Sequence, residues 1–155
     1  MANRRLQLRR LQAALEQGRS LPVELQTRLL EAVHAALDGG EILDVLAPTM
    51  TRTDMEARNR HIMRARDALD GAGHEQLARA AEKVEARLVS GELDPERPGR
   101  WPAMREFEQH LALALIRGPM ISRSQFYQIQ SDQGADRTAC DDHSQIKRAV
   151  ENWSP

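Results

Sequence analysis

Residues 103–116 form the one long segment that is apolar on nearly every side. Its large side chains recur at steps of three, four and four residues, the spacing of one face of an α-helix: Met104, Phe107, Leu111 and Leu115. A helix of this kind has to be covered by neighbouring segments. The sequence therefore predicts a chain organised around a buried central helix. Gly118, followed by Pro119, is the expected left-handed end of that helix.

The rest of the chain also has the pattern of helices joined by turns. All nine glycines fall between periodic segments rather than inside them. We expect further helices at 4–17, 22–38, 41–47, 53–69, 74–90 and 123–131, and a last one from about residue 142. In the second of the long helices the inward stripe is predicted to be Leu25, Leu29, Val33 and Ala36. Thr53 and Glu56 have the spacing of a capping box for the helix at 53–69.

These expectations define the fold class. The chain is predicted to be all-α, a compact bundle of about five long and two to three short helices in one domain, 1–155. Residues 92–101 contain two prolines and a glycine and are expected to form a long surface loop. We do not expect a domain boundary there, because the 55 residues from Trp101 onward could bury too little surface for secure independent stability.

The charge and the cysteine content of the chain limit its possible partners and its cellular compartment. The net charge of −1 does not favour wholesale attraction to nucleic acid or membranes, although residues 1–66 carry net +3 (11 basic, 8 acidic) and residues 67–155 net −4 (11 basic, 15 acidic). Cys140 is the only cysteine, so an internal disulfide is excluded. No apolar run is long enough for a membrane span or a secretory signal. A cytoplasmic protein with no membrane partner is expected.

Catalytic and metal-binding patterns are weak. Glu31 and His34 have the spacing used in carboxylate-bridged di-iron bundles, but no second copy of the motif occurs. Cys140 and His143 carry ligand-type atoms, yet neighbouring residues at a helix start cannot readily surround a tetrahedral ion alone. No glycine-rich phosphate loop or nucleophile elbow is present. We therefore predict no enzyme activity, no catalytic residue, no cofactor and no metal.

The segment after Pro119 offers a nucleic-acid hypothesis. Ser122 and Gln125 have the spacing of a capping box that opens a polar helix over 122–131. In pattern this start resembles the recognition helix of helix-turn-helix regulators, with Arg123, Gln125 and Gln128 of suitable length to reach base edges. The alternative is an ordinary capped helix that packs through Phe126 and Ile129.

Arginine-rich helix surfaces provide the other candidate contacts, either for an anionic partner or as plain solvated faces. The complete set of predicted partner or nucleic-acid contacts is Arg5, Arg9, Arg58, Arg60, Arg64, Arg123, Gln125 and Gln128. Our first hypothesis is a non-enzymatic helical adaptor, inhibitor or regulator that binds a protein partner through a charged surface. In broad character such chains are similar to small accessory proteins of phages and mobile elements. The alternative is a DNA-binding regulator. A homodimer is expected if one chain cannot cover the central helix.

Overall fold

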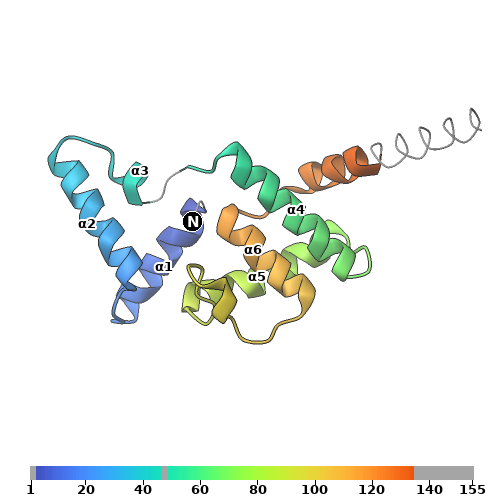
Figure 1. The fold of residues 1–155 in the computed structure, drawn as a ribbon, viewed down its shortest axis with the longest axis horizontal. Coiled ribbons are helices and arrows are strands. Elements are labelled where there is room, and N and C mark those ends of the chain that lie inside the picture. Colours follow the sequence, from blue (N-terminus) through green and yellow to red (C-terminus); the bar gives the residue numbers. More distant parts are fainter. Residues whose placement is uncertain (1–2, 47–48, 135–155) are drawn as a thin grey trace, which may run out of the picture. The chain divides into compact units, whose positions relative to one another are not determined.

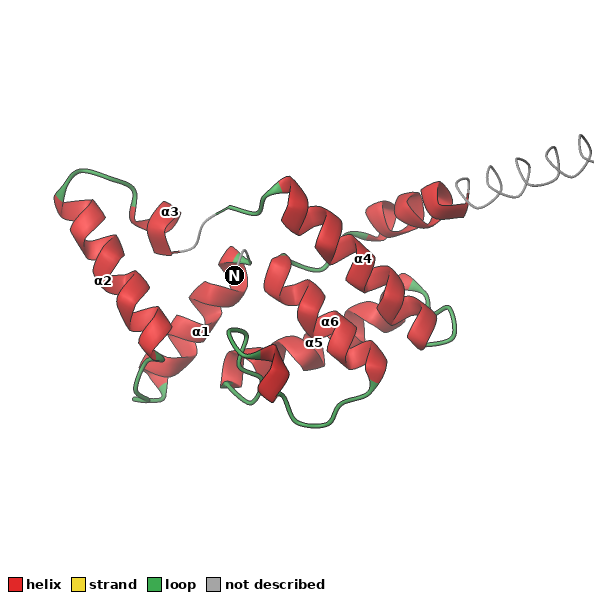
Figure 2. Ribbon diagram, viewed as in Figure 1, coloured by secondary structure: helices red, strands yellow, loops and turns green. Residues whose placement is uncertain are grey.

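The computed structural model describes residues 3–46 and 49–134, and within these ranges every regular element is a helix (Figures 1 and 2). The long helices are α1 (Arg4–Glu16), α2 (Val23–Leu37), α4 (Arg52–Ala68), α5 (His74–Ser90) and α6 (Glu106–Arg117). The short ones are α3 (Ile42–Leu46) and the 3₁₀ turn η1 (Pro98–Arg100). The predicted all-α bundle is confirmed. The chain divides into two compact units, Met1–Met120 and Ile121–Pro155, which are described separately.

In the first unit, α6 is the central helix, as its sequence predicts. It packs most extensively on α4 and also on α5, while α1 packs on α5 and α2 on α3. Leu111, Ala112 and Ala114 of α6 are buried. They meet a core to which α4 and α5 contribute Ile62, Met63, Leu77, Val84 and Leu88. Burial of these side chains from water is the main stabilising term for the unit.

Asn3 fixes the start of α1 against the end of α6. Its Oδ1 accepts a hydrogen bond from the Leu6 backbone N–H at 3.1 Å, which caps α1. Its Nδ2 donates to the Leu115 carbonyl at 2.6 Å, and its own backbone N–H donates to the Ile116 carbonyl at 3.3 Å. One buried side chain therefore joins two helices more than a hundred residues apart.

Two predicted helix starts are wrong by a few residues. The capping box of α4 is Thr51 with Asp54 rather than Thr53 with Glu56. The central helix begins at Glu106 rather than residue 103, and the backbone N–H of Arg105 donates to Glu108 Oε2 at 3.2 Å. In contrast, α5 has the predicted bounds, and Gly91 ends it in the left-handed conformation with φ +84°.

Gly118 ends α6 for a different reason from the one predicted. Its φ of −177° is extended, so no left-handed cap forms. A Cβ at this position would meet Met50 Sδ and would lie 3.1 Å from Arg58 Cδ. Glycine leaves room here for the side chains of Met50 and Arg58, which would have to shift if a Cβ were added.

The proline-containing segment 92–101 lies inside the first unit and is held to it. Leu93 is fully buried. The indole Nε1 of Trp101 donates to the Asp94 carbonyl at 2.7 Å, so the two ends of the segment are closed on each other. Trp101 therefore belongs to the loop and not to the helix that follows.

The second unit begins with the predicted capped helix. The Ser122 backbone N–H donates to Gln125 Oε1 at 3.2 Å, and the Gln125 backbone N–H donates to Ser122 Oγ at 3.3 Å. The capping box is confirmed. Residues 123–134 are helical, so the helix runs at least three residues beyond its predicted end at residue 131. The predicted helix from residue 142, together with Cys140 and His143, lies outside the described residues.

Candidate functional site

Arg5 and Arg9 lie one turn apart on α1 and line a groove of about 530 Å³. The apolar part of the groove comes from Leu8, Met50 and Pro119. Arg5 is exposed, and Arg9 Nη1 lies 3.3 Å from Glu85 Oε2 on α5. The structure thus brings these two predicted contacts together at a groove with an apolar wall.

Arg58 is not on the surface, and its prediction as an exposed contact is wrong. Only 7% of the residue is accessible. Its Nη1 donates to the Pro119 carbonyl at 3.3 Å and its Nε donates to Asn59 Oδ1 at 3.1 Å. Burial lowers the pKa of its guanidinium. Arg58 therefore ties α4 to the segment after α6 and is not available to a partner.

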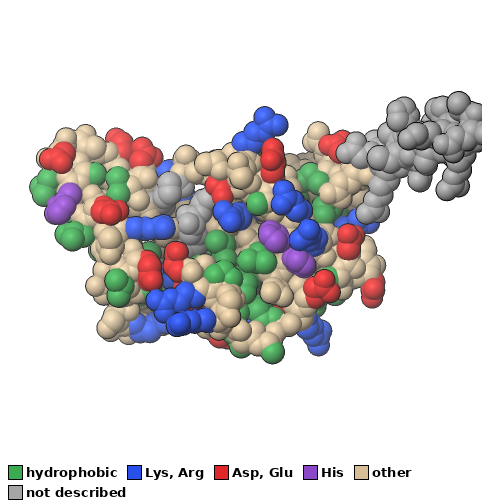
Figure 3. Space-filling model, viewed as in Figure 1, with side chains coloured by type: hydrophobic (Ala, Val, Ile, Leu, Met, Phe, Trp, Pro, Cys, Tyr) green, Lys and Arg blue, Asp and Glu red, His purple; other side chains and the backbone are tan. Residues whose placement is uncertain are grey.

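Arg60 and Arg64, in contrast, are exposed on α4. Neither forms an ion pair with any residue in the described part of the chain. Between them in sequence lies His61, whose Nδ1 is 3.2 Å from Nδ1 of His110 on α6. The two rings are stacked, with centroids 5.4 Å apart. Figure 3 shows histidine and arginine side chains gathered over α4 and α6.

The histidine pair belongs to a polar edge that runs along the antiparallel helices α4 and α6. Near one end Arg117 Nη1 lies 3.2 Å from Asp54 Oδ1. Toward the other end Arg64, Glu106 and His110 line a hollow of about 450 Å³. Arg117 and Asp54 carry opposite charges and attract each other. His61 and His110 are two side chains of the same kind, and they would repel each other if both were protonated.

The electrostatics of this edge disfavour a charged His61. Burial is the largest cause that lowers the pKa of His61, and positive charges nearby lower it further: His110, Arg64, Arg60 and Arg117. A hydrogen bond between the two Nδ1 atoms requires one ring to donate and the other to accept, so one imidazole is neutral there. No local pattern indicates this pair, because 49 residues separate its members.

Six of the ten exposed large hydrophobic residues in the described part of the chain lie on α2 and α3. We call this group the α2–α3 surface and define it by these six side chains: Val23, Leu30, Val33, Leu37, Ile42 and Leu43. Leu30 is 58% and Leu37 79% accessible. Val33 was predicted to face inward and is exposed instead; α2 buries Leu25 and Ala32 on its other side.

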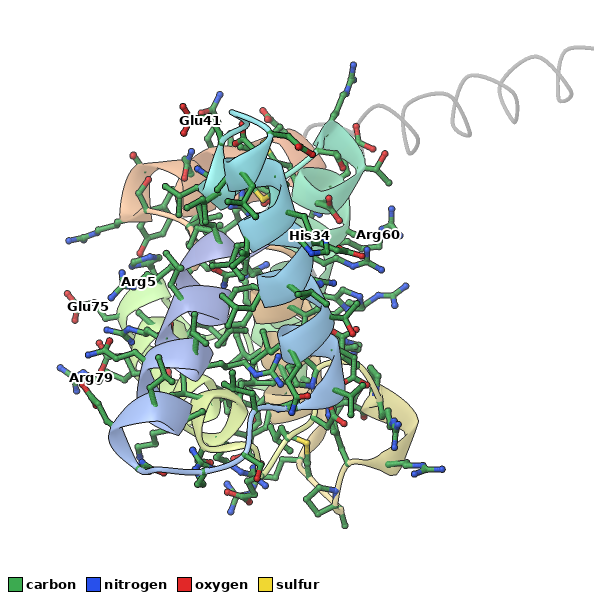
Figure 4. All side chains as sticks on the ribbon, turned by 90° about the vertical axis from the view of Figure 1, so that its left-hand side faces the viewer. Arg5, His34, Glu41, Arg60, Glu75 and Arg79 are labelled. Atoms are coloured by element: carbon green, nitrogen blue, oxygen red, sulfur yellow. The ribbon has the colours of Figure 1, made fainter. Side chains whose placement is uncertain are left out.

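Acidic side chains lie along one side of the apolar row on α2 and in the turn to α3. Residues 23–46 contain five acidic residues and one arginine, a net charge of −4: Glu24, Arg28, Glu31, Asp38, Glu41 and Asp44. Glu24, Arg28 and Asp44 take part in ion pairs, with Arg97, Glu96 and Arg4 respectively. Glu31, Asp38 and Glu41 form none with the residues that the structure describes. Figure 4 looks onto α2 and shows the labelled Glu41 and His34 at its periphery.

The predicted contacts of the second unit are all exposed. Gln125 uses its Oε1 in the capping box, so only its amide nitrogen is left to donate. The guanidinium carbon of Arg123 lies 5.9 Å from the centroid of the Tyr127 ring, a distance at which cation and ring attract. Arg123 and Gln128 can therefore still meet a ligand.

Comparisons of the chain with protein-family models, with curated proteins and with solved structures gave no match. Among the residues described, no helix has the length and apolar character to cross a membrane. In the same residues no three His, Cys, Asp or Glu side chains are grouped as metal ligands.

Proposed function

We propose that this protein is a non-enzymatic helical adaptor or regulator that binds a protein partner through the α2–α3 surface. The observation that carries the proposal is the exposure of six large apolar side chains on two adjacent helices. The proposal differs from a purely charged contact, because the surface has an apolar centre with acidic side chains beside it. We place the protein in the cytoplasm, because its single cysteine cannot form an internal disulfide and disulfides are rare in that compartment.

The grouping of these side chains supports a binding role. Six exposed apolar side chains lie on two helices that pack on each other, and grouped exposed apolar side chains are typical of interaction sites. Single exposed leucines need no explanation, but a group of this size in water is disfavoured. An apolar centre with charged surroundings is also the usual anatomy of an interface between proteins.

The test is affinity capture from a host lysate with matched variants. Wild type is compared with the double variant Leu30→Asp, Leu37→Asp and with Leu15→Asp on α1. Leu15 is 64% accessible, so it controls for adding a charge at an exposed leucine. We expect one stoichiometric protein to be retained by wild type and by Leu15→Asp, and to fall more than tenfold with the double variant, because central apolar anchors carry most binding energy. Equal capture by all three proteins would refute the proposal.

A second candidate function is DNA binding by the second unit. It is favoured by the exposure of Arg123 and Gln128 on helix 123–134, where long polar side chains can reach a nucleic acid. It predicts retention of random duplex DNA in a gel shift at low salt, with affinity that falls steeply as salt rises. Arg123→Ala should then relax sequence preference, whereas Arg60→Ala with Arg64→Ala should weaken all sequences alike. Absence of any shift at low salt would eliminate this candidate.

A further inference from the structure

The spacing of the apolar side chains on α2 indicates that the partner segment that binds the α2–α3 surface is a helix. Val23, Leu30 and Leu37 are seven residues apart, and Val33 lies between the last two. Such a row repeats every three or four residues, which is the seam that a second helix packs against at a shallow angle. Gln26 holds the equivalent position between Val23 and Leu30, and its side chain is tied to the Leu21 carbonyl at 2.7 Å. The seam is therefore strongest from Leu30 to Leu37.

The acidic side chains beside this seam indicate which charges the partner helix should carry beside its own apolar face. Glu31 and Asp38 each follow a seam leucine directly, and Glu41 lies in the turn that leads to α3. All three are exposed, and none is neutralised by a described basic residue. A partner helix with Lys or Arg beside its apolar face would gain attraction at each of these positions, and one with Asp or Glu would be repelled.

We propose, resting on the protein-binding function above, that the α2–α3 surface receives an amphipathic α-helix of a partner protein with basic residues flanking its apolar face. A second copy of this chain fits less well, because Glu31, Asp38 and Glu41 of one copy would face the same three carboxylates of the other. The chain's own residues 141–155 contain three acidic and two basic residues, so they carry no basic excess. Charge complementarity therefore favours a different protein.

Two synthetic helical peptides of about three heptads test this proposal on the full-length protein. They share one leucine seam, and one has lysine and the other glutamate at every flanking position. Fluorescence anisotropy should show the lysine peptide binding at least about tenfold more tightly at low salt, with the difference shrinking near 0.5 M salt as the charges are screened. Glu31→Gln with Glu41→Gln should reduce the preference severalfold. Glu75→Gln with Glu82→Gln on α5 removes the same charge elsewhere and should leave it unchanged.

The outcomes separate this proposal from the function on which it rests. Equal binding of both peptides, or binding of neither, overturns the basic helix while Leu30- and Leu37-dependent capture of a partner can still stand. A concentration-dependent dimer in light scattering that Leu30→Asp with Leu37→Asp abolishes would identify a second copy as the occupant and overturn it as well. Preference for the lysine peptide that the Glu31 and Glu41 changes remove supports it.

Discussion

Acidification should destabilise the first unit through His61 and His110. In the folded protein the pKa of His61 lies below its ordinary value of 6.5 because of burial and of the positive charges of His110, Arg64, Arg60 and Arg117. The unfolded chain therefore takes up a proton near pH 6.5 that the folded chain resists. The stability contributed by the neutral imidazole is complete above about pH 6.5 and is lost as the pH falls toward the folded pKa.

The size of this effect follows from the ring separation. Two imidazolium charges with centroids 5.4 Å apart repel by about 1 to 3 kcal/mol for effective dielectric constants of roughly 80 to 20. Because both rings are only partly buried, solvent screening places the expected loss near the lower end, about 1 kcal/mol. For a unit of this size that corresponds to a fall of roughly 3 to 5 °C in the melting temperature.

The assay is urea unfolding followed by circular dichroism at about pH 7.5 and about pH 5, a window set by the titration of histidine. His61→Asn keeps a polar group that can hydrogen-bond to His110 Nδ1 but cannot become charged, so about 1 kcal/mol of the acid-induced loss should disappear. His34→Asn removes an exposed histidine of α2 and should leave the loss intact. Asp54 does not interfere, since hydrogen bonds from Thr51 lower its pKa below 3.8 and its contribution is lost only at more acid pH. An unchanged pH dependence in His61→Asn would refute the reasoning.

Two further predictions concern helix ends. Thr51→Ala should lower the free energy of unfolding by about 1 kcal/mol by removing the cap of α4, whereas Thr53→Ala, at the position the sequence suggested, should change it by a few tenths at most; chemical denaturation of both variants separates the two caps. Gly118→Ala should cost about 1 to 3 kcal/mol in a thermal melt, because its Cβ would meet Met50 Sδ and Arg58 Cδ, while Gly99→Ala, with open space around it, should be nearly neutral. Equal effects of the paired changes would contradict these assignments.

Local signals in the sequence were sufficient for most of the fold. The bounds of α5 were predicted correctly because a glycine stands on either side of it, at Gly73 and Gly91. The start of α4 was misplaced because two overlapping Thr-x-x-acid patterns occur, and the capping box forms at Thr51 and Asp54. The central helix α6 begins three residues later than predicted, at Glu106, where the backbone N–H of Arg105 donates to Glu108 Oε2.

The candidate surfaces depend on pairings that local patterns do not encode. His61 and His110 meet only because α4 and α6 are antiparallel in one particular register. The exposure of Val33 depends on which side of α2 the chain buries, and an apolar helix with two apolar sides leaves that undecided. Arg58 shows the reverse error, since a long charged side chain was assigned to solvent and is enclosed by the segment after α6.

The attachment of α2 has a consequence for how this molecule can change over time. α2 packs chiefly on the short α3, and its buried anchors, Leu25 and Ala32, point away from the seam. Residues 23, 30, 33 and 37 can therefore be replaced without disturbing the packing among α4, α5 and α6. Under the proposed function, selection for a new partner and selection for a stable fold would act on separate sets of side chains, so recognition could diverge while the architecture persists.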